Sequence, residues 1–262
     1  MPNSAKLLVK SSLRALGYTV LDLNKNNDLR VFLAGHLKSV FATLRINCVI
    51  DVGAHVGEYG RMLRQIGYAG RIVSIEPVRA AFERLQAAAA GDRDWMTLQL
   101  ACGSTEEVRP INLFSIDVLN SLLPPSENFR EIDPEGVLTT ETVTVRRLDS
   151  LLDDALKSIQ RPRIFLKTDT QGFDLEVLKG AGDRIHEVVG LQSEVALQPL
   201  YEDVPNYLQF LSYCRDIGFE PTGFFPIFHS PLTQQMVEMD AVLTRSANGG
   251  GANGNRQKNL DR

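Results

Sequence analysis

A segment with two glycines and a histidine carries the residue types best suited to holding a cofactor. It reads Asp51-Val-Gly-Ala-His-Val-Gly57 and lies between an apolar, β-branched run and a stretch with helical spacing. A strand, a glycine turn and a helix start bring backbone N–H groups and the positive helix end close to a ligand. The next apolar run ends in Glu76-Pro77, where nucleotide-binding α/β sheets place an acid for ribose hydroxyls. The predicted cofactor-binding residues of this part of the chain are Asp51, Gly53, His55, Gly57, Glu76 and Pro77.

The spacing of the two glycines distinguishes between cofactors. A dinucleotide turn requires Gly-x-Gly-x-x-Gly, but His55 stands two residues after Gly53. Asp-x-Gly-x-x-x-Gly is typical of enzymes that use S-adenosylmethionine (SAM), so the chain resembles a class I methyltransferase here. Ala101-Cys102, at the end of the third apolar run, would face the same edge of the sheet, where an adenine would lie. A nicotinamide-dependent oxidoreductase, or an ordinary strand-to-helix turn without a ligand, are the alternatives.

Two acids at the ends of later apolar runs are the catalytic candidates. Asp169 follows Ile164-Phe-Leu-Lys-Thr, and Glu194 closes the next predicted strand. Methyl transfer to an alcohol requires aligned reactants and a base or a metal that lowers the proton cost of the hydroxyl. Asp169 is the first candidate for that base, and its alternative role is to cap a helix that begins near Phe173. Together, Asp169 and Glu194 could hold Mg²⁺, or they could act without metal as a base and its orienting partner.

Other side chains offer weaker candidates. His229 could act as a base on the carboxyl-terminal loop, although a lone histidine is more often structural. A set of aromatic residues could line an acceptor pocket or belong to the core. These are Tyr201, Phe224, Phe225 and Phe228.

The elements that would position these residues alternate between strands and helices. Strands are predicted near residues 49–52, 71–77, 95–101, 143–148, 163–169 and 188–195, with another at 108–116 and a final antiparallel pair at 219–228 and 239–244. Helices are predicted at 28–44, 58–66, 78–90, 149–158, 173–178 and 205–217. This order predicts a doubly wound, mainly parallel, seven-stranded Rossmann-like α/β sheet with an antiparallel last strand. The predicted domain division is a helical segment (1–45), a SAM-dependent methyltransferase domain (46–245) and a disordered Gly/Asn-rich tail (246–262).

Composition excludes several classes of function. The net charge of −4 and pI near 5.6 offer no electrostatic footprint for nucleic acid. Three distant cysteines form no disulfide or zinc pattern, and no stretch reaches the length of a membrane span. A cytoplasmic protein is the default expectation. A basic amphipathic helix in residues 1–20 could touch an anionic membrane surface weakly, but packing against the domain is the commoner outcome.

Four motifs resemble those of the FkbM family of SAM-dependent O-methyltransferases. They are Asp51–Gly57 (the family usually has Asn where this chain has His55), Glu76-Pro77, Leu148-Asp-Ser-Leu151, and Leu166-Lys-Thr-Asp-Thr-Gln-Gly172 followed by Glu176-Val-Leu-Lys-Gly-Ala181. The last motif is the most specific and covers the family's Lys-x-Asp-x-Glu-Gly pattern. One departure stands out, because the family's Glu is Gln171 here, which removes a second carboxylate beside Asp169.

The resemblance implies an O-methyltransferase acting on a hydroxyl of a natural product. The expected acceptor is a small molecule, above all a sugar such as a rhamnosyl unit of a glycolipid, or a polyketide. Gln171 lends support to a different class, a non-catalytic partner subunit with the same fold. Residues 119–136 are predicted to be a long loop, which is either part of a lid over the site or a connector.

Overall fold

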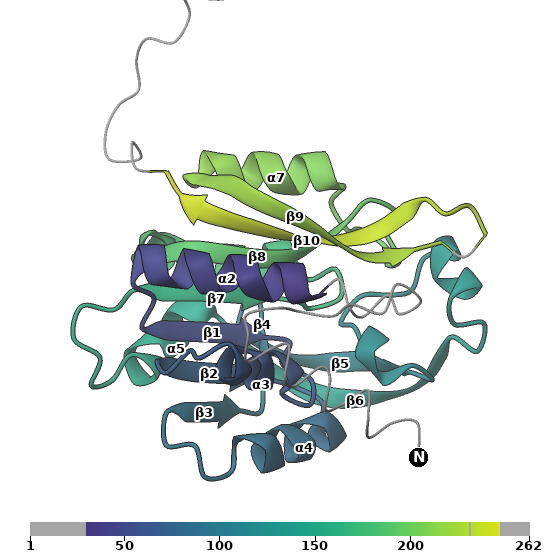
Figure 1. Ribbon diagram of the computed structural model, residues 1–262. Coiled ribbons are helices and arrows are strands. Elements are labelled where there is room, and N and C mark those ends of the chain that lie inside the picture. The colour runs from purple at the N-terminus through teal and green to yellow at the C-terminus, as the bar shows by residue number, and fades with distance from the viewer. Residues whose placement is uncertain (1–29, 231, 247–262) are drawn as a thin grey trace, which may run out of the picture.

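The computed structural model describes residues 30–230 and 232–246, and its centre is a seven-stranded sheet (Figure 1). The strand order is β3-β2-β1-β7-β8-β10-β9. The bounds are β1 Cys48–Val52, β2 Arg71–Ile75, β3 Trp95–Leu98, β7 Ile164–Thr168, β8 Val188–Ala196, β9 Phe219–His229 and β10 Met236–Arg245. Strands β3, β2, β1, β7 and β8 pair in parallel, whereas β10 is antiparallel to both of its neighbours. The predicted fold class, including the antiparallel last strand, is confirmed.

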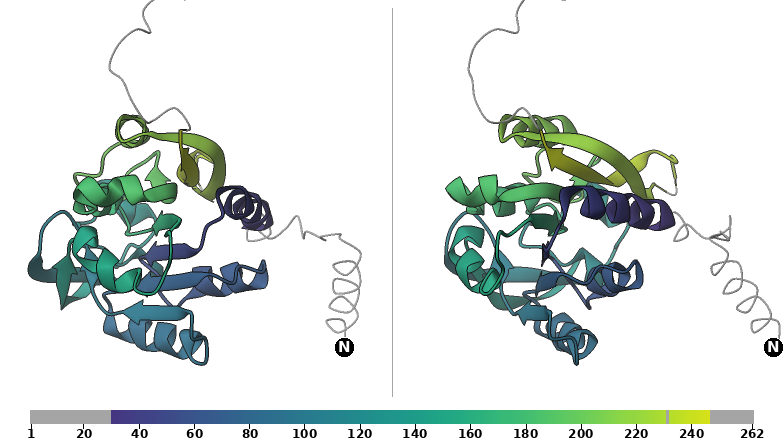
Figure 2. Two further views of the ribbon diagram at one scale, coloured as in Figure 1. Left: turned by 90° about the vertical axis from the view of Figure 1, so that its left-hand side faces the viewer. Right: turned by 60° about the vertical axis from the view of Figure 1, so that its left-hand side comes forward.

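Helices cover both faces of this sheet (Figure 2). On one face, α2 (Arg30–Leu44), α3 (Glu58–Gln65) and α4 (Arg79–Ala89) share an apolar cluster with side chains of β1, β2 and β7. On the other face, α5 (Leu148–Ala155), α6 (Asp174–Gly180) and α7 (Tyr207–Asp216) form a second cluster with the alternate side chains of the same strands. Strands β1 and β7 are therefore buried on both faces, which explains their continuous apolar sequence.

A second, smaller sheet was not predicted. The third apolar run, expected as one strand over residues 95–101, divides into β3 and the short β4 (Ala101–Cys102), which leaves the main sheet. Strand β4 pairs with β6 (Val137–Arg146), and β6 pairs with β5 (Glu107–Phe114). Strand β6 begins six residues before the predicted start at residue 143, because its first half is exposed and is held by pairing with β5, which the local sequence does not reveal.

The segment predicted as a long loop contains short structure. The 3-10 helices η2 (Asp117–Leu119) and η3 (Glu127–Glu131) lie between β5 and β6, and a third, η4 (Gly182–Glu187), follows α6. Phe129 of η3 is fully buried against Phe114 and Tyr201, so this segment has a core of its own. The predicted basic helix at residues 1–20 and the predicted tail, apart from Ser246, lie outside the described residues.

Among the described residues, no helix combines the length and the apolar character that a bilayer span requires.

Gly53 shows why the turn after β1 requires glycine. Its φ is +76°, and a Cβ at this position would lie 1.8 Å from the carbonyl oxygen of Asp169. The turn and the end of β7 therefore approach so closely that no side chain fits between them. This close approach, and not the room needed by a ligand, sets the residue type here.

We expect Gly53→Ala to destabilise the fold more than Gly67→Ala. Gly67 also has a positive φ (+90°), but a Cβ there would meet nothing within 4 Å. Gly67→Ala should therefore cost only the left-handed backbone strain, about 1–2 kcal/mol. Gly53→Ala adds a backbone clash that forces the ends of β1 and β7 apart. Urea unfolding of both variants measures the difference, and equal losses would refute the steric explanation.

Candidate active site

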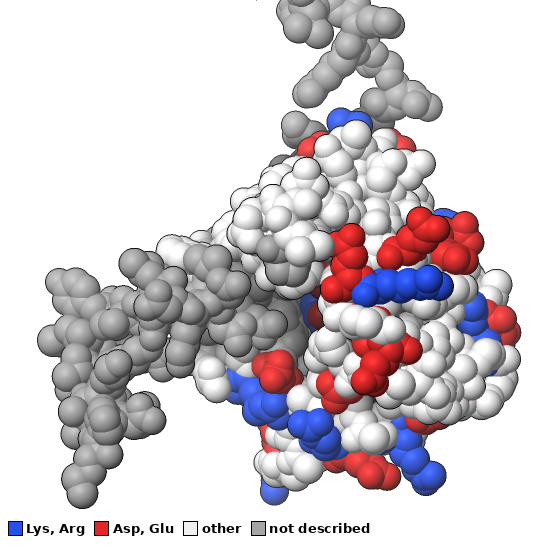
Figure 3. Space-filling model, turned by 90° about the vertical axis from the view of Figure 1, so that its right-hand side faces the viewer, with Lys and Arg blue, Asp and Glu red and all other residues white. Residues whose placement is uncertain are grey.

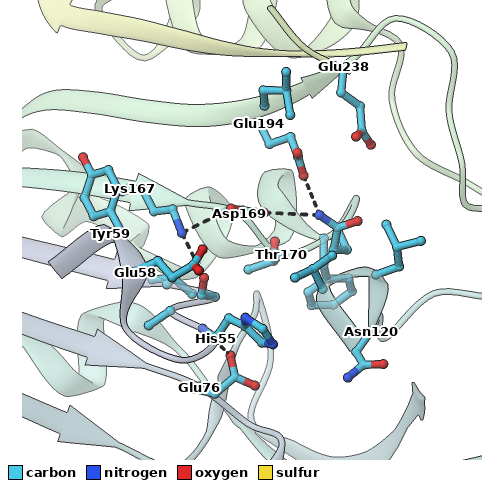
Figure 4. Close-up of a pocket in the computed structure, with 18 of the residues that line it drawn as sticks. His55, Glu58, Tyr59, Glu76, Asn120, Lys167, Asp169, Thr170, Glu194 and Glu238 are labelled. Atoms are coloured by element: carbon cyan, nitrogen blue, oxygen red, sulfur yellow. Dashed lines mark hydrogen bonds and ion pairs between the residues drawn. The ribbon is translucent and has the colours of Figure 1, made fainter. Parts of the chain in front are cut away.

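A cavity of about 590 Å³ lies at the carboxyl ends of the parallel strands (Figure 4). It extends from the ends of β2 and β4, over the turn after β1, to β8 and the start of β10. Parallel α/β sheets bind ligands at this edge. Of the predicted site residues, the cavity brings together Gly53, His55, Glu76, Pro77, Ala101, Cys102, Asp169 and Glu194.

Two predicted cofactor residues do not line the cavity. Asp51 is fully buried behind the turn, where Oδ2 accepts a hydrogen bond from Ser74 Oγ (3.1 Å) and Oδ1 lies 3.0 Å from Lys167 Nζ. A Cβ on Gly57 would contact side chains of α4 and Trp95, so this glycine faces the helix layer. Both residues lie behind the turn, so of the predicted residues in this turn only Gly53 and His55 line the cavity.

The half of the cavity beside β2 and β4 presents one buried acid between apolar walls. Glu76 accepts the backbone N–H of His55 on Oε2 (2.9 Å) and that of Val78 on Oε1 (3.0 Å). Burial raises the pKa of Glu76 to about 7, against these two hydrogen bonds, which act to lower it. The walls are formed by apolar side chains, among them Ile75, Pro77, Ala101, Leu122 and Phe173.

His55 forms part of the wall of this half of the cavity. Its backbone is left-handed (φ 45°), and its Nε2 lies 3.3 Å from Oδ2 of Asp117 in η2. Residues 116–120 line the cavity next to this contact. The segment between β5 and β6 therefore forms a wall of the site and does more than connect two strands.

Lys167 is the charged centre of the site, although it was not predicted. Its side chain is only 6% exposed, and Nζ lies 3.0 Å from Asp51 Oδ1, 3.4 Å from Asp169 Oδ2 and 2.9 Å from the carbonyl oxygen of Gly53. Burial alone would lower the pKa of Lys167, but Asp51 and Asp169 raise it above its ordinary value. Lys167 therefore stays charged and joins the end of β1 to the end of β7.

Gln171 connects the two predicted catalytic acids. Its Nε2 donates to Glu194 Oε2 (2.7 Å) and to Asp169 Oδ1 (3.3 Å), the two dashed lines that end at these labelled acids in Figure 4. Its Oε1 accepts from Tyr201 (2.9 Å). Glu194 does not end its strand as predicted, because β8 continues to Ala196.

The arrangement does not fit a Mg²⁺ ion shared by Asp169 and Glu194. The Gln171 NH₂ group, a donor, stands where such a cation would contact both carboxylates. In the described ranges, no group of three or more His, Cys, Asp or Glu side chains is arranged to hold a metal.

The surroundings separate the proton affinities of Asp169 and Glu194. Burial acts to raise the pKa of Asp169, but Lys167 and the hydrogen bonds of its neighbours hold it below the ordinary value. Burial, followed by the charges of Glu238 and Asp169, raises the pKa of Glu194 well above its ordinary value. A charged carboxylate thus lies beside one that readily holds a proton, which is the pattern of an acid–base pair.

The sequence matches a known protein family over most of the residues that form this site. Residues 51–221, more than half of the chain, match the methyltransferase FkbM domain. The chain belongs to this family. The expected methyl donor, SAM, is confirmed with it, and the oxidoreductase alternative falls away.

Likenesses to solved structures are distant, and no curated protein matches the sequence. Fibrillarin from Aeropyrum pernix, solved with bound S-adenosyl-L-methionine, is 10% identical over 74% of this chain and 66% of that chain, with a TM-score of 0.41. A putative methyltransferase from Thermobifida fusca is 9% identical over 84% of this chain and 80% of that chain, with a TM-score of 0.45. The methyltransferase domain of METTL16 is 9% identical over 94% of this chain and 80% of that chain, also with a TM-score of 0.45. Similarity at this level carries no argument about substrate.

The remaining predicted residues divide between the cavity and other places in the fold. Phe225 and Phe228 line the cavity, but Phe224 is exposed outside it. Tyr201 is buried below it, with its hydroxyl 2.6 Å from the carbonyl oxygen of Leu119 and 2.9 Å from Gln171 Oε1. His229 is exposed at the end of β9 and does not line the cavity.

Several residues that line the cavity were missed by the sequence analysis. Tyr59 donates to Gln192 Oε1 (2.8 Å), and Gln192 donates to Asp240 Oδ1 (2.8 Å). Glu238 and Asp240 alternate along β10, which is a detectable period-two signal, but the predicted strand began only at Met239. For Lys167, a charged residue inside the apolar run of β7 was the available signal.

We expect Lys167→Met to lower the free energy of unfolding by about 3–5 kcal/mol, because it leaves Asp51 buried without its counter-charge. The double variant Asp51→Asn/Lys167→Met should lose less than Lys167→Met alone. Lys179→Met is the matched control: Lys179 pairs with Glu176 on the exposed side of α6, where such a pair contributes about 1 kcal/mol or less. Urea unfolding tests all three, and similar losses for Lys167→Met and Lys179→Met would contradict the assigned role.

Proposed function

We propose that this protein is an O-methyltransferase that transfers the methyl group of SAM to a hydroxyl of a small-molecule acceptor. The observation that carries the proposal is the position of Asp169. Its side chain is 41% exposed, faces the cavity and stands between the half beside β2 and the half beside β10. A carboxylate between a donor site and an acceptor site is placed to receive the proton of an attacking hydroxyl.

The half beside β2 is the proposed site of the adenosine group. Glu76 can accept hydrogen bonds from ribose hydroxyls on lone pairs that the two backbone N–H groups leave free. The apolar residues around Ala101 and Cys102 would hold the adenine ring, and Gly53 would lie beneath the methionine part. When bound, SAM supplies an electrophilic methyl group.

The chain's own residues would orient the acceptor and move its proton. Asp169 is held charged by Lys167, so it can accept the hydroxyl's hydrogen bond and align the oxygen for in-line attack. Glu194, connected to Asp169 through Gln171, is the neighbouring carboxyl group with the higher proton affinity. No metal is needed in this arrangement.

The acceptor we propose is a natural-product hydroxyl, above all that of a sugar on a glycolipid or of a polyketide. Its support is the family resemblance together with a cavity large enough for a cofactor and part of an acceptor. Nucleic acid is not expected as a partner, and a cytoplasmic location stays a prediction.

We expect Asp169→Asn to reduce kcat by roughly 10²-fold or more while the protein folds and binds S-adenosylhomocysteine nearly as well as the parent. The fold should survive because Lys167 keeps its pair with Asp51, and because no side chain caps α6, so the alternative capping role has no support. Asp216→Asn, an exposed acid on α7 outside the cavity, is the control and should keep full activity.

The assay is the formation of S-adenosylhomocysteine, run with and without EDTA. Activity should persist in EDTA. An active Asp169→Asn enzyme would remove Asp169 from the chemistry, and loss of activity in EDTA that Mg²⁺ restores would reinstate the metal.

We also expect the affinity for S-adenosylhomocysteine to fall as the pH drops through about 7, the pKa of Glu76. Above this pH the carboxylate is charged and accepts strongly from ribose hydroxyls, whereas below it a proton occupies one oxygen. The loss between pH 8 and pH 6 should be roughly tenfold. Calorimetric titration of the parent and of Glu76→Gln measures it, because the Gln variant should bind more weakly at pH 8 and show no such step.

A further inference from the structure

The half of the cavity beside β8 and β10 is lined by acids from both strands. Asp240 is the cross-strand partner of Glu194, and Glu238 is the partner of Ala196 on the same face of the sheet. All three acids line the cavity. Because β10 is antiparallel to β8, its first residues lie at the edge of the sheet where β7 and β8 end. These acids therefore line the same cavity as Asp169.

Within the described residues, the cavity lining carries fewer positive than negative side chains. Among the described residues that line the cavity, Lys167 is the only lysine or arginine, and it already contacts Asp51 and Asp169. On the face of the molecule that Figure 3 shows, by contrast, acidic and basic side chains lie next to each other. The excess of carboxylates is thus a property of the cavity lining and not of this face.

Glu238 is the acid that most clearly lacks a partner. It is only 8% exposed, and its carboxylate points into the cavity without an interaction with the other residues drawn in Figure 4. No side chain or amide in the described ranges donates a hydrogen bond to it. Burial, followed by the charges of Asp169, Asp174 and Asp240, raises the pKa of Glu238 to about 8.

A buried carboxylate without a partner is costly, and a protein keeps one where a ligand supplies the missing charge. A metal ion is a poor candidate, since Gln171 donates into the same group of acids. An anionic acceptor, such as one that carries a phosphate, would be repelled. A compact organic cation offers several N–H donors and leaves its carbon skeleton for the apolar wall formed by Leu200, Ile227 and Phe228.

We propose that the acceptor carries a protonated amine near the hydroxyl that is methylated, as in an amino sugar, and that Glu238, with Glu194 beside it, binds this ammonium group. The proposal rests on the proposed O-methyl transfer for the identity of this half as the acceptor site. Asp169 orients the hydroxyl, while Glu238 selects which molecules enter.

The test measures binding of matched sugars to the protein saturated with S-adenosylhomocysteine, so that the cofactor's own ammonium site is filled. The probes are aminodeoxyglucoses with the amine at carbon 2, 3, 4 or 6, their N-acetyl counterparts and glucose, titrated by ligand-observed NMR. At least one free amine should bind tenfold or more tightly than its N-acetyl counterpart and than glucose. If no amine is preferred in the parent protein, the proposal is overturned.

Two variants assign the preference to a residue. Glu238→Gln should bring the best amine to within about twofold of its N-acetyl counterpart, and its affinity for S-adenosylhomocysteine should be unchanged. Because the change removes an uncompensated buried carboxylate, its melting temperature should equal or exceed that of the parent. Glu220→Gln, an exposed acid on β9 outside the cavity, should keep the full preference. A preference that survives Glu238→Gln contradicts the proposal.

Product analysis separates this proposal from the proposed function. Incubation with SAM and the preferred amine, followed by mass spectrometry, shows whether oxygen or nitrogen carries the methyl group. A methyl on nitrogen with a Glu238-dependent preference refutes O-methylation and leaves the ammonium site standing. O-methylation of neutral and amino sugars at equal efficiency supports the function and refutes the ammonium site.

Discussion

The contact between Lys167 and Asp51 is the interaction on which the site depends. Nζ of Lys167 contacts Asp51, the carbonyl oxygen of Gly53 and Asp169, so one cation holds the turn after β1 and the proposed catalytic carboxylate in a fixed relation. Because the pair is buried, its formation is offset by desolvation, and its value lies in the geometry that it imposes. The close packing of Gly53 against the Asp169 carbonyl imposes the same relation sterically.

This ion pair belongs to a polar row that crosses the central sheet. Ser74, Asp51, Lys167 and Gln192 are successive cross-strand partners on β2, β1, β7 and β8. The row continues at one end to the indole N–H of Trp95, 3.0 Å from Ser74 Oγ, and at the other through Gln192 to Asp240. A shift of one residue in any of these strands would turn its polar side chain to the opposite face of the sheet. The row therefore specifies the register of the strands whose ends form the cavity.

The sequence predicted the features that local patterns encode and missed those that depend on distant partners. The apolar runs of β1 and β7, the turn at Gly53 and the acids Glu76 and Asp169 each have a local signal, and the turn and both acids lie at the predicted edge of the sheet. Asp51 and Gly57 were assigned to the cofactor because they belong to the motif, yet their partners, Lys167 and the α4 layer, stand behind the turn. The small sheet was missed because β4 has two residues and β6 depends on pairing with β5.

Gln171 shows how a departure from the family pattern can be accommodated within the same chemistry. A glutamate at this position would place a third carboxylate against Asp169 and Glu194, and such a group would need a cation or a shared proton to be stable. The amide removes that need, since one NH₂ group approaches both acids while its oxygen accepts from Tyr201. The amide therefore leaves both catalytic candidates in place, with a hydrogen-bond donor between them. A subunit that had lost its chemistry would have no use for a charged Asp169 held at the cavity by Lys167, so Gln171 is better explained as a change in how the acids are held together than as a sign of lost activity.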